Sequence, residues 1–276
     1  MKKIYLALLL LIQGGSMWAQ KSSELGFGLG FSTYLGDLKS EDFSYRMPGF
    51  AHGFSYRQNW NPYLTTKAFL NVCRIHGDDR NDTDPSHRSR NLNFRSDIWE
   101  IGYQAEYNVL PFDAFNPHRN ADRRHFNFTP YFFGGLNLFH FNPKTYYKGS
   151  YVALQPLNTE GQNSTLSTES SYSRTQFALP FGFGLKAQLT RFVVISYEVG
   201  FRKTFTDYLD DVSGRYVNLQ SLADSKGSLA AELSYRGDEL PDNTYTPRQG
   251  EIRGNPDNKD WYIINSLNVA FKLYKK

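Results

Sequence analysis

Acidic and basic residues recur within segments that otherwise alternate bulky apolar residues with small ones. Seven of them fall on the face that carries glycine, serine and other small or polar residues: Lys67, Glu100, Glu106, Lys186, Glu198, Arg202 and Lys272. A buried charge is tolerated when it is paired, and both signs of charge are present here. We therefore expect these residues to form an internal network of salt bridges. The alternative is a selective pore lined by charge, which requires an open lumen.

Histidine is the residue type most often used as a general base, so His52 and His76 are the candidates for catalysis by an exported lipid acyl hydrolase. Such an enzyme also needs a nucleophile within reach of the base. Neither histidine is flanked by a recognisable serine motif. The sequence therefore predicts no enzyme, no catalytic residue and no cofactor, and a lipid-modifying activity is the less favoured alternative.

A third polar group lies between residues 110 and 126 and is mainly basic. Its members are His118, Arg119, Arg123, Arg124 and His125. The two histidines and Asp122 have a mixed spacing that is not typical of a metal site, so no metal is predicted. A docking surface for an acidic or periplasmic partner is one interpretation of the cluster. Contact with anionic lipid headgroups, or simple solubility, explains it equally well.

The secondary-structure elements that position these residues can be predicted from the alternation of apolar with polar or small residues. Alternation with a period of two is the pattern of β-strands with one apolar face. In residues 25–32, leucine and phenylalanine alternate with glycine and serine. Eight segments are predicted as strands: 25–32, 50–60, 64–73, 99–109, 128–141, 176–189, 193–204 and 261–273. In the segment 128–141, aromatic residues occur at both odd and even positions. The pattern therefore does not indicate which face of this strand points inward.

Strands with one apolar face and one small or polar face favour an all-β fold, an eight-stranded antiparallel up-and-down transmembrane β-barrel with long external loops. Tight turns at 61–62 and 190–191 alternate with long connections. The long ones are 37–48, 76–90, 142–174 and 208–260. Outer-membrane barrels keep their periplasmic turns short and both termini in the periplasm, so these connections are expected outside, and 110–126 is an unusually long periplasmic turn. Residues 218–235 fit a short helix interrupted by Gly227.

The first residues are typical of a cleavable signal peptide, because Lys2 and Lys3 precede an apolar run that is too short to span a bilayer. We expect a signal peptide over 1–19 and the barrel domain over 20–276. Cys73 is the single cysteine, which excludes an intramolecular disulfide and lipid attachment near residue 19. The many Tyr, Phe and Gly residues favour strands, and the net charge of +4 gives no reason to expect nucleic acid binding.

Five motifs, in order and spacing, resemble the small outer-membrane barrel component of the type IX protein secretion machinery, the Por system. They lie at residues 24–38, 56–63, 90–94, 179–184 and 206–213. The more specific parts are the turn at 36–38 and the segment 208–213, which follows directly on Asp207. The motif positions there are Gly36, Asp37, Asp207, Tyr208, Asp210 and Asp211. By their chemistry, these carboxylates can serve simply to accept hydrogen bonds from the loop backbone at strand ends.

The resemblance implies a non-enzymatic accessory of secretion in the outer membrane. It would help to anchor a periplasmic ring, built from a lipoprotein and its partner protein, and its other contacts would be outer-membrane lipids. The turn at 110–126 and the ends near Gln20 and Lys276 are then the parts able to meet the ring. The final loop is longer than is usual in that family. A free-standing barrel that passes small solutes is the alternative function.

Overall fold

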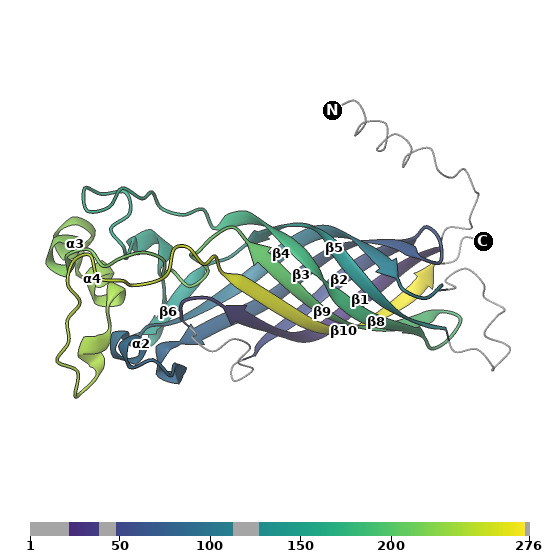
Figure 1. Ribbon diagram of the computed structural model, residues 1–276, viewed down its shortest axis with the longest axis horizontal. Helices are drawn as coiled ribbons and strands as arrows, with labels where there is room; N and C mark the ends of the chain where they lie inside the picture. The colour runs from purple at the N-terminus through teal and green to yellow at the C-terminus, as the bar shows by residue number, and fades with distance from the viewer. Residues whose placement is uncertain (1–21, 39–47, 113–126, 274–276) are drawn as a thin grey trace, which may run out of the picture.

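The computed structural model describes residues 22–38, 48–112 and 127–273. Within them, eight antiparallel strands form a barrel, and loops with short helices cover one of its ends (Figure 1). No described helix is both long and apolar enough to cross a membrane. The expected signal peptide and the basic residues between 118 and 125 lie outside the described residues.

The barrel strands are β1 (Ser22–Leu35), β2 (Gly49–Asn59), β3 (Leu64–Asp78), β4 (Asn93–Asn108), β5 (Phe128–His140), β8 (Thr175–Gln188), β9 (Val193–Thr204) and β10 (Trp261–Leu273). Their order around the sheet is β3-β2-β1-β10-β9-β8-β5-β4, and β3 also pairs with β4. The first strand pairs with the last over a register from Ser23↔Leu273 to Leu35↔Trp261. The sheet is therefore closed, and the predicted eight-stranded fold is confirmed.

The strand β5, whose facing the sequence left open, turns Phe132 and Leu136 outward and Tyr131, Phe133 and Phe139 inward. The inward rings occupy space that glycines on neighbouring strands leave free. A Cβ atom added at position 184 would lie 2.6 Å from the Tyr131 ring, and one at position 182 would lie 2.8 Å from the Phe133 ring. Both faces of β5 therefore carry aromatic residues. Those on the outer face belong to the exposed apolar surface, and those on the inner face fill lumen space next to glycines of neighbouring strands.

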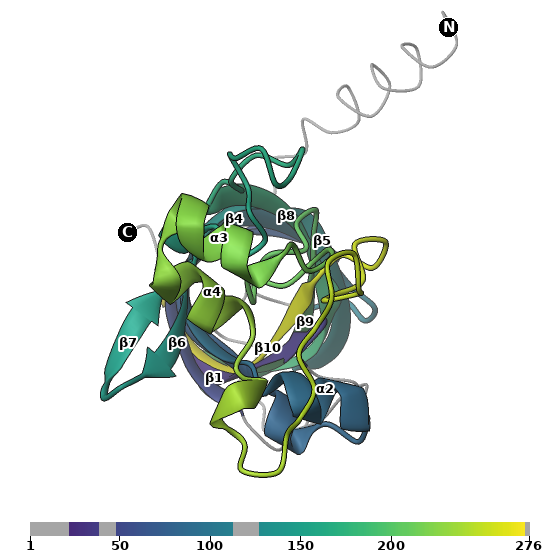
Figure 2. The same cartoon turned by 90° about the vertical axis from the view of Figure 1, so that its left-hand side faces the viewer.

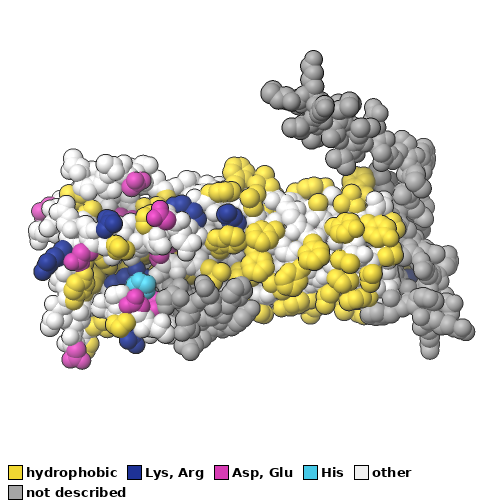
Figure 3. All heavy atoms as spheres, in the orientation of Figure 1, with side chains coloured by type: hydrophobic (Ala, Val, Ile, Leu, Met, Phe, Trp, Pro, Cys, Tyr) yellow, Lys and Arg dark blue, Asp and Glu magenta, His cyan; other side chains and the backbone are white. Residues whose placement is uncertain are grey.

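The outer surface of the barrel carries a broad band of exposed leucine, phenylalanine, tyrosine and tryptophan side chains (Figure 3). Trp99 and Ile101 on β4, for example, are 56% and 59% exposed. Monomeric soluble proteins rarely expose apolar patches of this extent. Charged side chains gather on the covered end instead (Figure 3). The band is the surface that a lipid bilayer would cover, as in transmembrane barrels.

The covered end has its own apolar core, which loops and strand ends share. Inward residues Tyr34, Ile75 and Ile98 pack there with Leu209 and Leu233 from the connection between β9 and β10. That connection holds α3 (Leu219–Lys226) and α4 (Ser228–Ser234), which meet at Gly227 with φ +96°. The predicted interrupted helix is thus confirmed. Seen end-on, the two helices lie over the barrel mouth (Figure 2).

Smaller elements complete the covered end. They are η1 (Asp79–Asn81), α2 (Pro85–Arg90), the hairpin of β6 (Pro143–Tyr147) and β7 (Ser150–Ala153), η3 (Gln155–Leu157) and η4 (Gly237–Glu239). The hairpin attaches to β4 through the pair Arg95↔Lys144 and stands at one side of the barrel (Figure 2). The short turns 60–63 and 189–192 lie at the opposite end, together with the start of β1 and the end of β10 (Figure 1). The connections β2–β3 and β8–β9 are therefore short and lie at this end as predicted, and the β4–β5 connection is the long exception that the sequence indicated.

Candidate functional site

The larger of two ion-pair clusters that the described strands place in the lumen is centred on Arg57, which lies on β2 and is 2% exposed. Its Nε donates to Glu106 at 2.9 Å, and its Nη2 donates to Glu198. Lys67 donates to Glu198 at 2.6 Å. Lys186 donates to Glu106 at 3.1 Å. Five charges from five strands are thus joined across the interior, and each carboxylate serves two cations.

The second cluster is centred on Glu100, which is buried on β4. Arg202 on β9 donates to it at 3.0 Å, and the Tyr262 hydroxyl on β10 donates at 2.7 Å. The amides of Asn71 and Asn137 donate at 2.7 and 2.6 Å. Four neighbours therefore satisfy this single carboxylate, as a buried charge requires.

The structure brings six of the seven predicted lumen residues into these two clusters. The seventh, Lys272, donates to Gln188 at 2.6 Å and lies 5.8 Å from the centroid of the Phe112 ring. The expected network omitted Arg57, its most connected member. The signal was in the sequence, because alternation within 50–60 places Arg57 on the same face as Ala51 and Gly53.

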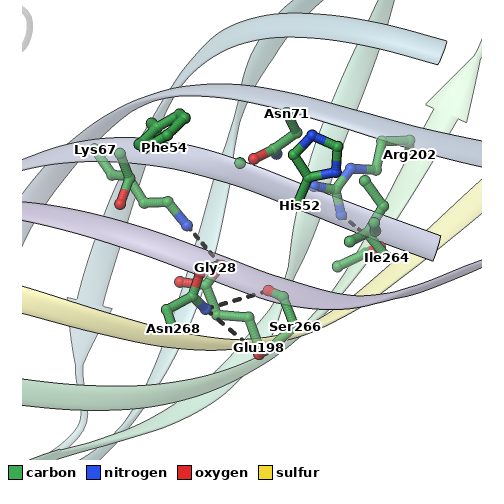
Figure 4. Close-up of a pocket in the computed structure, with 14 residues that line it drawn as sticks. Gly28, His52, Phe54, Lys67, Asn71, Glu198, Arg202, Ile264, Ser266 and Asn268 are labelled. Carbon is green, nitrogen blue, oxygen red and sulfur yellow. Dashed lines mark hydrogen bonds and ion pairs between the residues drawn. The ribbon is translucent and has the colours of Figure 1, made fainter.

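A small cavity of about 20 Å³ separates the two clusters. Lys67 and Glu198 line it from the first cluster, and Arg202 lines it from the second (Figure 4). A space of this size holds about one water molecule. The clustered side chains therefore occupy the lumen at this level.

The family-motif positions are gathered at the covered end, where they join separate connections. Asp210 accepts hydrogen bonds from the Tyr34 hydroxyl at 2.5 Å and from the backbone N–H of Val212 at 2.9 Å. Asp37 accepts one from the backbone N–H of Asn255 at 2.8 Å. A Cβ at Gly36 would lie 2.0 Å from the Tyr34 hydroxyl oxygen, so that close approach requires glycine.

Two further motif positions continue this set of contacts. Asp211, in the left-handed region at φ +69°, accepts hydrogen bonds from the hydroxyls of Thr159 and Tyr172, both at 2.6 Å. The ring of Tyr208 stacks on that of Tyr172 with centroids 4.6 Å apart, and its hydroxyl donates to Glu160 at 3.3 Å. The motif thus binds the 141–174 connection to the 205–260 connection.

Asp207 differs from the other motif carboxylates, because its oxygens make no close hydrogen bond within the described residues, although it is 2% exposed. Burial raises the pKa of Asp207 to about 7; an interaction with Ser213 opposes this shift, and the negative charge of Asp37 acts in the same direction as burial. Burial also raises the pKa of Asp211 to about 6. The covered end is therefore more stable when these carboxyl groups hold their protons.

The two histidines do not meet in a catalytic arrangement. His52 lies beside Phe50 on β2, with ring centroids 5.4 Å apart, on the outward-facing set of residues. His76 pairs with Arg95 between β3 and β4, toward the covered end. Within the described residues, no group of three or more His, Cys, Asp or Glu side chains is arranged to hold a metal ion.

Replacing Glu198 by glutamine is expected to destabilise the barrel by about 3 kcal/mol or more, because it leaves Arg57 and Lys67 without this buried counter-charge. Urea unfolding of the purified protein in detergent, followed by tryptophan emission, measures the change. Glu232→Gln is the matched control, since Glu232 pairs with Lys148 on the surface. Equal unfolding free energies for the two variants would contradict the structural role of the network.

The covered end should lose stability as the pH rises from about 4 to about 7. An unfolded Asp207 releases its proton near pH 4 and the folded one near pH 7, so folding is favoured at the lower pH within that window. Limited proteolysis of the 205–260 connection at about pH 5 and about pH 8 measures this difference. Asp207→Asn should reduce it, whereas Asp257→Asn, at an exposed position of the same connection, should retain it. An unaltered difference in Asp207→Asn would exclude Asp207 as its cause.

Comparison with known proteins adds a family and distant fold relatives. No curated protein matches the sequence. Among solved structures, the chain is similar to Ail, the attachment invasion locus protein of Yersinia pestis, in complex with the heparin analogue sucrose octasulfate (8% identity, TM-score 0.42, covering 92% of this chain and 100% of that chain). It is also similar to Neisserial surface protein A (14% identity, TM-score 0.40, covering 92% and 98%). Likenesses at this level carry no inference about activity or ligands.

A family model described as "Domain of unknown function (DUF6089)" matches residues 2–235. The match extends over most of the sequence, and the chain therefore belongs to the DUF6089 family.

Proposed function

We propose that this protein is a non-enzymatic outer-membrane barrel of the type IX protein secretion machinery. Its role would be to anchor a periplasmic ring, which contains a lipoprotein and a partner protein, to the outer membrane. The resemblance of the motifs at 24–38 and 206–213 supports the choice of machinery. The observation that carries the anchoring role is the occupied lumen. A barrel whose interior is filled by side chains provides no passage across the membrane, but it can serve as a fixed attachment point in it.

Placement in the outer membrane is supported by three features taken together. The strands form a closed antiparallel barrel, the outer surface is an apolar band, and the connections at one end are long while those at the other are short except between β4 and β5. Closed barrels of this kind cross the outer membrane with short turns and both termini in the periplasm. On this placement the covered end faces outward, and the turns 60–63 and 189–192 face the periplasm.

The occupied lumen weighs against a passive solute channel. Arg57, Glu106 and Glu198 lie across the interior in direct ion pairs, and the cavity above them holds about one water molecule. A lipid-modifying enzyme is less favoured, since His52 packs beside Phe50 on the outer face and no described nucleophile hydrogen-bonds it.

The periplasmic contact is proposed for the connection between β4 and β5. From the sequence it carries His118, Arg119, Arg123, Arg124 and His125, a basic cluster where most barrels have only a short turn. Positive charge of this density favours an acidic partner surface and faster association with it.

Reversing both charges with Arg123→Glu and Arg124→Glu should reduce the amount of periplasmic ring that co-purifies with the barrel from solubilised membranes. The matched control is Arg88→Glu with Arg248→Glu, two exposed arginines of the covered end that give the same change in net charge. Quantitative mass spectrometry of the affinity-purified material gives the recovery. Unchanged recovery in the first variant, or an equal loss in the control, would contradict the proposed contact.

A further inference from the structure

A groove of about 760 Å³ opens on the outside of the barrel, between the upper parts of β3 and β4 and the β6–β7 hairpin. Arg74 and Arg95 line it from the barrel wall, and Tyr146 and Tyr151 line it from the hairpin. Both tyrosines are exposed and form an edge-to-face pair with centroids 5.3 Å apart. The ion pairs Asp78–Arg80 and Arg236–Glu239 also line the groove, the second of them from the covered end. Because each of these pairs is balanced in charge, the excess positive charge comes from Arg74 and Arg95, and the groove is a basic and aromatic surface that the lumen network does not use.

The groove begins where the apolar band ends. Strand pairing places Val72 opposite Trp99, and the next outward pair toward the covered end is Arg74 opposite Asp97. A strand rises about 3.3 Å per residue, so Arg74 lies about 7 Å along the strand from the level of Trp99. Beyond the hydrocarbon core, the headgroup layer of a bilayer has about this depth. The arginines are therefore at the height of lipid headgroups.

The local charges leave capacity for an anion. Arg74 and Arg95 share one carboxylate, that of Asp97, at 2.6 and 3.7 Å. All three side chains are between 34% and 45% exposed, so these ion pairs are weak and open to exchange. The Arg95 guanidinium lies over the Tyr151 ring, 4.5 Å from its centroid, which holds its plane. Two neighbouring guanidiniums with a net positive charge, one of them oriented by the Tyr151 ring, are suited to bidentate binding of phosphate.

We infer that this groove binds the phosphorylated headgroup of a glycolipid in the outer leaflet. The arginines would hold the phosphate, the tyrosine pair would contact sugar rings, and the acyl chains would lie on the apolar band below Trp99. Continuity with that band favours a membrane lipid over a soluble polyanion. The inference rests on the proposed placement, with the covered end outside.

The test uses the purified full-length protein in detergent micelles and diphosphorylated lipid A as the probe, with bound lipid measured by native mass spectrometry. Arg74→Gln with Arg95→Gln should weaken binding about tenfold. Asp97→Asn should strengthen it, because a competing carboxylate is removed. Arg191→Gln is the matched control, since Arg191 also lies 4.5 Å from an aromatic centroid, that of Phe192, but in the short turn at the other end of the barrel.

Lipid A without phosphates and inorganic phosphate alone are the comparison probes. Weak binding of the first, and failure of the second to displace lipid A, would support the inference. Displacement by inorganic phosphate alone would indicate a site for free phosphate and would overturn the lipid assignment. Unchanged lipid A affinity in a folded double variant would also overturn it while leaving the barrel and its placement intact. A wild-type protein that does not fold into micelles would instead contradict the placement.

Discussion

Hydrocarbon offers no hydrogen-bond partner to a polypeptide backbone, so a sheet that crosses a bilayer must close on itself. In this protein, closure depends on the pairing of β1 with β10, which joins the first and last barrel strands over nearly their whole length. Eight strands enclose a narrow lumen that side chains can fill. The contents of the lumen, and the apolar band outside it, both follow from this closure.

The lumen is filled by two kinds of side chain in succession. Along the inward face of β4, Phe94 and Ile98 near the covered end give way to Glu100 and Glu106 farther down. On each barrel strand, polar, small or charged residues that face the lumen interrupt the apolar residues of the outer face. No single strand therefore has the continuous apolar run of a membrane-spanning helix.

Much of this architecture could be predicted from alternation alone, because a period of two assigns each residue to one face of a strand. The facing of β5 could not, since Tyr131 and Phe133 fill space left by glycines on other strands. The same alternation also assigns Arg57 to the inner face of its strand, although the expected lumen network does not contain it. The burial of Asp207 depends on how distant parts of the chain, such as Asp37 and Glu160, pack near it, and the hairpin beside Arg95 depends on pairing with β4; neither has a local signal.

Hydrogen exchange of backbone amides, measured by mass spectrometry on the protein in lipid nanodiscs, tests closure most directly. In a closed barrel, amides of β1 and β10 exchange as slowly as those of β8 and β9, because none of these strands is an edge. Fast exchange confined to β1 and β10, with the other strands protected, would show an open sheet and would contradict closure of the barrel.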